Sequence, residues 1–137
     1  MPLEYDSKQL YNYDSKCDHS PFHPDIICIN LGTNDTSEDN YDIALYEKHY
    51  RDFLTHLRTL HPNAKIVLLT GAMLQGQALA DVKAVLDKLA SEDRLIYRFD
   101  MSPQTGELGY GADWHPSARQ AEKMADELIP YLRTLIP

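Results

Sequence analysis

The chain carries Pro-Asp-Ile-Ile-Cys-Ile-Asn-Leu-Gly-Thr-Asn-Asp at residues 24–35, an apolar run that stops abruptly at Gly32-Thr33-Asn34-Asp35. A short apolar run that ends in glycine and small polar residues is typical of a buried strand. Open α/β sheets collect their ligands at the carboxyl ends of such strands. The residues after this strand are therefore candidates for a functional site, where Asn34 can supply an amide donor.

Two later segments repeat the pattern of a short apolar run followed by polar residues. The three runs predict strands at about Ile26–Leu31, Lys65–Gly71 and Arg94–Phe99, each rich in β-branched or aromatic residues. None of them alternates between apolar and polar positions. We therefore expect a parallel sheet that is covered on both faces.

Helical periodicity fills the segments between and after these strands. Apolar residues at steps of three and four predict helices at about Tyr41–Leu60 and Leu79–Ala90, and a third helix that begins at Ser117. Ser117 and Gln120 have the spacing of a capping box, while Pro130 is expected to kink or shorten the third helix. The alternation of strands and helices predicts an α/β fold, a three-layer α/β/α sandwich.

A second polar cluster, Asp113-Trp114-His115-Pro116, precedes the third helix. An imidazole with a pKa of about 6.5 suits proton transfer near neutral pH. Asn34 and His115 together indicate half of a hydrolase site. Taken alone, Asn34 also fits a turn or cap, and His115 a solvent-facing loop. No serine or cysteine has a recognisable nucleophile setting, because no apolar strand or glycine precedes the Asp-Ser pairs at 6–7 and 14–15.

The two clusters resemble blocks of the SGNH (GDSL-type) esterase superfamily, and within it the carbohydrate acetyl esterases, such as the acetyl xylan esterases of carbohydrate esterase family 2. Residues 32–35 fit the third block, Gly-x-Asn-Asp, and residues 111–116 fit the fifth, which carries the catalytic histidine. The nucleophile block, Gly-Asp-Ser, and the second block are expected before residue 1. The chain thus resembles the carboxyl-terminal part of such a domain, with the last three strands of the flavodoxin-like order 2-1-3-4-5.

The resemblance implies removal of acetyl groups from carbohydrate by Ser-His acyl transfer, with His115 as general base and acid and Asn34 as oxyanion donor. The family usually places an orienting aspartate three residues before the histidine, where this chain has Ala112. Asp113 is two residues before it, and on an extended segment would lie on the same side as His115. Asp113 is thus left as an orienting, substrate-contacting or loop-bonding residue, with a backbone carbonyl as the alternative orienter.

Gly32 and Trp114 are the candidate substrate-binding residues. Gly32 allows a tight backbone turn after the strand. Trp114 is the only tryptophan of the chain, and an aromatic wall of this kind suits a sugar ring, although simple packing explains it equally well.

The 137 residues, 43% of them hydrophobic, are sufficient for one domain with a sizeable core. Residues 1–23 are polar and rich in tyrosine, and are predicted to form an N-terminal arm or loop, while residues 24–137 form the SGNH-like α/β domain. One flank of the first strand would remain unpaired, which is an aggregation hazard. Self-association or the N-terminal segment is expected to cover it.

The formal net charge of −8 argues against a nucleic-acid or anionic-membrane partner, because both require a basic face. The expected partner is an acetylated carbohydrate or another small ester. No cofactor and no metal are predicted: Cys17, His19 and His23 lie close in sequence, but no second ligand cluster follows. Cys28 is expected to be a core residue, and His49 and His56 to belong to a solvated helical stripe.

Two other functions remain open at this point. One is a catalytically inactive remnant that binds carbohydrate in the same cleft. The other is a Rossmann-like binding module whose motifs match by accident, a reading weakened by the absence of a Gly-x-Gly-x-x-Gly loop. The compartment is left unknown by the residues, and only the resemblance suggests a secreted or periplasmic protein.

Overall fold

The computed structural model describes residues 4–9 and 11–136, so the predictions for residues 1–3, 10 and 137 lie outside the described part. The elements follow in this order: β1 (Ser7–Gln9), β2 (Asn12–Lys16), β3 (Ile26–Asn30), α1 (Ile43–Leu60), β4 (Lys65–Thr70), α2 (Gly76–Ser91), β5 (Ile96–Asp100), the 3₁₀ turn η1 (Ala112–Trp114) and α3 (Ala118–Leu135). The three predicted strands and three predicted helices are confirmed, with ends shifted by a few residues.

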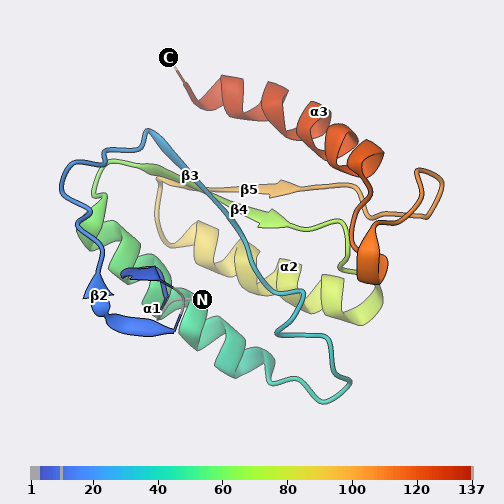
Figure 1. Ribbon diagram of the computed structural model, residues 1–137, viewed down its shortest axis with the longest axis horizontal. Helices are drawn as coiled ribbons and strands as arrows, with labels where there is room; N and C mark the ends of the chain where they lie inside the picture. Colours follow the sequence, from blue (N-terminus) through green and yellow to red (C-terminus); the bar gives the residue numbers. More distant parts are fainter. Residues whose placement is uncertain (1–3, 10, 137) are drawn as a thin grey trace.

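The main sheet is parallel and has the strand order β3-β4-β5. The register pairs Asn30 with Leu69 and Thr70 with Asp100, so the carboxyl ends of all three strands lie at one edge. Helices α1 and α2 cover one face of the sheet and α3 covers the other (Figure 1). This arrangement confirms the predicted α/β/α sandwich.

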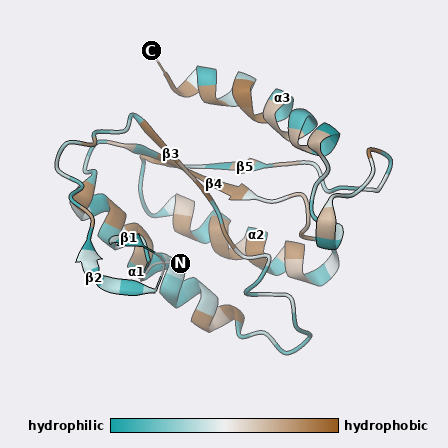
Figure 2. Ribbon diagram, viewed as in Figure 1, coloured by the Kyte–Doolittle hydropathy of each residue, from teal (hydrophilic) through white to brown (hydrophobic). Residues whose placement is uncertain are grey.

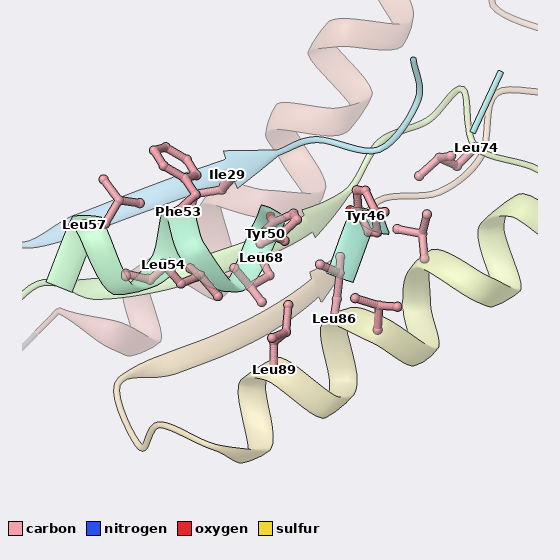
Figure 3. Packing of buried hydrophobic residues seen from close by; sticks show 13 residues of the cluster. Ile29, Tyr46, Tyr50, Phe53, Leu54, Leu57, Leu68, Leu74, Leu86 and Leu89 are labelled. Atoms are coloured by element: carbon pink, nitrogen blue, oxygen red, sulfur yellow. The ribbon is translucent and has the colours of Figure 1, made fainter. Parts of the chain in front are cut away.

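Two apolar clusters hold the layers together. The larger joins the sheet to α1 and α2 (Figure 3), with Ile66 and Leu68 of β4 fully buried in it. The smaller lies beneath α3, where Val67 and Leu69 of the same strand meet partly buried side chains. Figure 2 shows that β3 and β4 are both largely hydrophobic strands. No helix within the described residues is long and apolar enough to cross a bilayer.

Helix α3 differs in one respect from its prediction. It continues through Pro130 to Leu135, so the expected shortening is wrong. Pro130 is exposed, and water can therefore solvate the carbonyl group that lacks its helical partner. The predicted cap is confirmed, since the Gln120 amide donates to Ser117 Oγ at 3.2 Å.

The N-terminal arm is a β-hairpin, so the prediction of a loop is wrong for this segment. Strands β1 and β2 pair antiparallel, which brings Ser7 opposite Lys16. The hairpin lies beside α1 (Figure 1), where the Tyr5 ring meets the Phe53 ring edge-on, with centroids 5.4 Å apart. It forms a sheet of its own and does not pair with β3, so the expectation that the arm covers the outer edge of β3 is also wrong.

A carboxylate holds this hairpin to α1. The Asp6 side chain accepts hydrogen bonds from His56 Nε2 at 2.9 Å and from His19 Nε2 at 3.1 Å. The hydrogen bond from His56 is the main reason why the pKa of Asp6 is below its usual value. The predicted solvated stripe is therefore wrong for His56, because helical periodicity carries no information about a partner 50 residues away.

The outer edge of β3 has no strand partner among the described residues. Cys28 on this strand is exposed, so its prediction as a core residue is wrong. The smaller cluster explains why Cys28 is exposed. In this cluster α3 packs on β4 and β5, and Ile26 is the only member from β3. Nothing in the described layers covers the middle of β3 on this face.

We expect Leu68→Ala to lower the free energy of unfolding by about 2–5 kcal/mol, because Leu68 is fully buried between the sheet and two helices. Ile129→Ala is the control, since its side chain on α3 is 44% exposed and its loss should cost less than about 0.5 kcal/mol. Denaturant unfolding of both variants measures the difference. Equal losses would show that the layers do not meet at Leu68 as described.

We expect acid to weaken the contact between the hairpin and α1, because protonation would charge His61. His61 is buried, and its Nε2 lies 3.3 Å from Tyr5 Oη of the N-terminal arm. Burial, then the charges of His19 and His23, lower the pKa of His61. Such a histidine contributes its full stability above the unfolded pKa of about 6.5 and loses it as the pH falls further. The melting temperature should therefore fall less in His61→Gln than in the wild type between about pH 7 and pH 5.

His49→Gln is the matched control for this measurement, because His49 is exposed on α1. It should keep the wild-type dependence on pH. The same slope in all three proteins would contradict a role for His61.

Candidate active site

The turn after β3 is built around Gly32. Its φ of +124° is a conformation that side chains disfavour, and a Cβ atom there would lie 3.0 Å from Tyr46 Oη. Thr36 closes the turn with two hydrogen bonds to the Gly32 carbonyl, from its amide at 3.0 Å and from its Oγ1 at 2.8 Å. Tyr46 Oη donates to the Leu31 carbonyl at 3.2 Å. The turn is thus fixed from both sides.

Asn34 projects from this fixed turn and is exposed. Its carbonyl accepts a hydrogen bond from Ser37 Oγ at 2.9 Å, which holds the backbone. Its side-chain amide makes no hydrogen bond within the part of the chain that the structure describes. An amide donor of this kind is available to an oxygen atom of a bound molecule.

The segment after β5 presents His115 at the same edge of the sheet. His115 Nδ1 donates to the Ala112 carbonyl at 3.0 Å, and the His115 amide donates to the same oxygen at 3.0 Å. The Gly111 amide in turn donates to the His115 carbonyl at 2.7 Å. A neutral imidazole that donates from Nδ1 keeps its lone pair on Nε2, so this ring is prepared to accept a proton there.

Two residues before His115 have left-handed backbones. Asp113 has φ 48° and ψ 42°, and Trp114 has φ 61°. The extended segment assumed for Asp113 is therefore wrong, because residues 112–114 form a 3₁₀ turn. No hydrogen bond joins Asp113 to His115 among the described residues. Left-handed geometry costs a residue other than glycine about 1–2 kcal/mol, so surrounding contacts must hold this turn.

The two candidate loops meet at one pocket of about 470 Å³. Thr33 lines it from the turn after β3, and Trp114 lines it from the loop that carries His115. The Trp114 ring is 71% exposed and meets the Tyr110 ring at a steep angle, with centroids 5.0 Å apart. Exposed aromatic rings beside polar side chains are suited to a ligand that is apolar on its faces and polar on its rim.

A second cavity of about 790 Å³ lies between α1 and the end of β3 with the turn that follows it, residues 30–35. Tyr50 lines it, and although Tyr50 is only 3% exposed, its buried hydroxyl has no hydrogen-bond partner among the described residues. Burial is the main cause that raises the pKa of Tyr50. Asn30 is the one residue of β3 that lines this cavity.

Residue patterns alone did not single out Gln104. It follows β5 by four residues and is 7% exposed, and it donates from Nε2 to the Trp114 carbonyl at 2.8 Å. Asn34 was found because its polar cluster follows a strand directly. The same rule applied to the end of β5 would have drawn attention to residues 101–104.

Two known proteins show how far the sequence similarity extends. "Cellulase/esterase CelE" from Acetivibrio thermocellus is 32% identical over 121 residues, which cover 85% of this chain and 15% of that protein. "Acetylxylan esterase / glucomannan deacetylase" from Cellvibrio japonicus is 37% identical over 122 residues, which cover 87% of this chain and 33% of that protein. The chain thus spans a third or less of the length of these curated relatives.

The fold agrees with this similarity. A solved structure of a family two carbohydrate esterase from Clostridium thermocellum, in complex with cellohexaose, superposes with a TM-score of 0.87 at 29% identity. The match covers 98% of this chain and 43% of that one. The sequence profile of the GDSL-like lipase/acylhydrolase family matches residues 3–128. Since this match covers nearly the whole sequence, the chain belongs to the GDSL-like lipase/acylhydrolase family.

Proposed function

We propose that this chain is the part of a carbohydrate acetyl esterase that supplies the general base and one oxyanion donor. The observation that carries the proposal is the pocket lined by both Thr33 and Trp114, because these residues belong to the loops of Asn34 and His115; neither Asn34 nor His115 itself lines this pocket. Family membership supports hydrolysis of an ester. The similarity to an acetylxylan esterase and glucomannan deacetylase supports an acetylated carbohydrate as the substrate.

In the proposed reaction, a serine hydroxyl attacks the acetyl carbonyl while His115 Nε2 takes the hydroxyl proton. The developing oxyanion accepts a hydrogen bond from the Asn34 amide, an interaction whose loss typically costs about 10²–10³ in kcat. His115 then returns the proton to the sugar oxygen as the carbon–oxygen bond breaks. Water hydrolyses the acetyl-serine by the same route, and acetate leaves.

The histidine in this proposal is oriented by a backbone carbonyl. The hydrogen bond from Nδ1 to the Ala112 carbonyl, at 3.0 Å, selects the tautomer that has its lone pair on Nε2. A carboxylate usually has this task in serine hydrolases. Asp113 belongs to a left-handed turn and makes no hydrogen bond to His115 within the described residues, which supports a Ser-His dyad.

The serine itself is proposed to lie on a segment outside this chain. The serines of the N-terminal hairpin are poor candidates, because the hairpin docks on α1 and the Ser7 hydroxyl is buried there. The unpaired edge of β3 leaves room for a further strand, which would end close to the turn that carries Asn34. A nucleophile at the carboxyl end of such a strand would reach the proposed site.

The exposed rings of Tyr110 and Trp114 also support the alternative of an inactive remnant that binds carbohydrate. Binding by these rings requires no nucleophile, so the two functions separate by experiment. The third interpretation, a binding module whose motifs match by accident, is wrong, because the chain belongs to an acylhydrolase family.

This chain alone is expected to hydrolyse p-nitrophenyl acetate little faster than the free imidazole of its own histidines. Without a positioned serine, only oxyanion stabilisation and general-base assistance remain. The measurement compares the chain with its His115→Ala variant and adds a fluorophosphonate probe to detect a reactive serine. Stoichiometric labelling of Ser7, Ser15 or Ser20 would show that the nucleophile lies within the chain.

In a protein that joins this chain to its Gly-Asp-Ser segment, His115→Ala should abolish deacetylation of acetylated xylan, whereas Asp113→Ala should have a far smaller effect. The difference arises because the Ala112 carbonyl, and not Asp113, bonds to the imidazole. An aspartate that completes a triad contributes about 10⁴ to kcat. Steady-state kinetics decide between the two: equal losses would make Asp113 the third catalytic residue.

A further inference from the structure

Gln104 is a buried residue that ties together two loops above the sheet. Its amide donates to the Ala72 carbonyl at 2.8 Å, and its carbonyl accepts a hydrogen bond from Gln75 Nε2 at 3.2 Å. Both partners belong to the connection between β4 and α2. Its side chain reaches in the other direction, where Nε2 donates to the Trp114 carbonyl at 2.8 Å.

The hydrogen bond from Gln104 to Trp114 is unlike the other hydrogen bonds that the described structure gives to residues 111–115. The other hydrogen bonds of residues 111–115 stay within that segment, as from the His115 amide to the Ala112 carbonyl. The Gln104 side chain therefore makes the single hydrogen bond by which the described structure attaches this segment to residues outside the 106–117 loop. Figure 1 shows the result, with η1 standing beside the first turn of α2.

The segment of residues 111–115 has a backbone conformation that needs support from other residues. Asp113 and Trp114 are consecutive left-handed residues and neither is a glycine. Such conformations persist only where the surroundings over-determine them. A donor fixed in the core and aimed at the Trp114 carbonyl supplies this constraint, because it sets the orientation of the peptide group that joins Trp114 to His115.

The other end of the Gln104 amide carries a cost to stability. A carbonyl only accepts hydrogen bonds, so Nε2 must face Trp114 and Oε1 must point away. Oε1 is buried and has no partner among the described residues. A buried acceptor without a partner destabilises a fold. An apolar side chain of the same size would avoid this cost but could not hold Trp114.

We propose that Gln104 is a positioning residue that holds the turn at Asp113 and Trp114, and through it the His115 imidazole. The effect of Gln104 on catalysis rests on the proposed function. Its effect on the order of the Trp114 turn does not, because that order can be measured without any ester.

The chain offers a direct probe, since Trp114 is its only tryptophan. In Gln104→Met, which has similar volume but no donor, we expect a larger and faster local component in the time-resolved fluorescence anisotropy of Trp114, and stronger quenching by acrylamide. Gln77→Met is the matched control, because Gln77 lies exposed on α2 and bonds only to Asp81. Circular dichroism confirms that each variant is folded. Unchanged anisotropy in a folded Gln104→Met would overturn the inference.

Gln104→Glu keeps the inference testable should the methionine variant fail to fold. The ionised carboxylate cannot donate to the Trp114 carbonyl, whereas the protonated acid can. Acidification should therefore restore the order of Trp114 in this variant, and the wild type scanned over the same pH range corrects for protonation of His115. Absence of any acid-dependent recovery beyond that of the wild type would count against the hydrogen bond as the cause.

Kinetics of the protein that carries the nucleophile segment distinguish the two proposals. Gln104→Met should lower kcat by up to about 10²-fold, as expected when a catalytic group is misplaced by an ångström or so. If His115→Ala retains activity while Gln104→Met still loosens Trp114, the proposed function fails and the positioning role stands. If His115→Ala is inactive and Gln104→Met leaves both kcat and Trp114 unchanged, the positioning role fails and the function stands.

Discussion

The buried central strand β4 is the constraint on which the rest of the structure depends. It hydrogen-bonds to a parallel neighbour on each side, and its residues 66–70 are buried. Its side chains alternate between the two clusters, so one strand binds both helical layers to the sheet. Because all three strands run in the same direction, every loop that follows a strand emerges at one edge. The candidate site lies at this edge for that reason.

Individual side chains, and not regular structure, hold the loops above this edge. Thr36 closes the turn that presents Asn34, and Gln104 connects the β4–α2 loop to the Trp114 turn. Thr70 Oγ1 donates to the Asp100 carboxylate at 2.9 Å, which joins the ends of β4 and β5 just below. Each of these residues belongs to or follows a strand and makes its bond through a polar side chain. The positions of Asn34 and His115 are thereby set by bonds that a rigid sheet supports.

The side of the sheet at β3 contrasts with this well-bonded edge. Cys28 on this strand is exposed, and Tyr50, whose buried hydroxyl has no partner among the described residues, lines the cavity of about 790 Å³ between α1 and the turn after β3. An open apolar edge of a parallel sheet is unusual, because parallel sheets are normally covered. The hairpin of residues 7–16 does not meet this need, since Asp6 directs it to His56 on α1.

The sequence by itself determined the layers and the candidate residues, because these depend on local patterns. The patterns are the apolar periods of strands and helices, the glycines that end apolar runs, and the blocks at residues 32–35 and 111–116. The Ser117 cap and the apolar stripe of α1 were predictable for the same reason. Only the tertiary structure decided the hairpin, the Asp6–His56 contact and the hydrogen bond from Gln104 to Trp114, since each joins groups whose partners no local pattern specifies. It also replaced the expected extended segment at Asp113 with a left-handed turn, because that conformation is sustained by contacts with the rest of the fold.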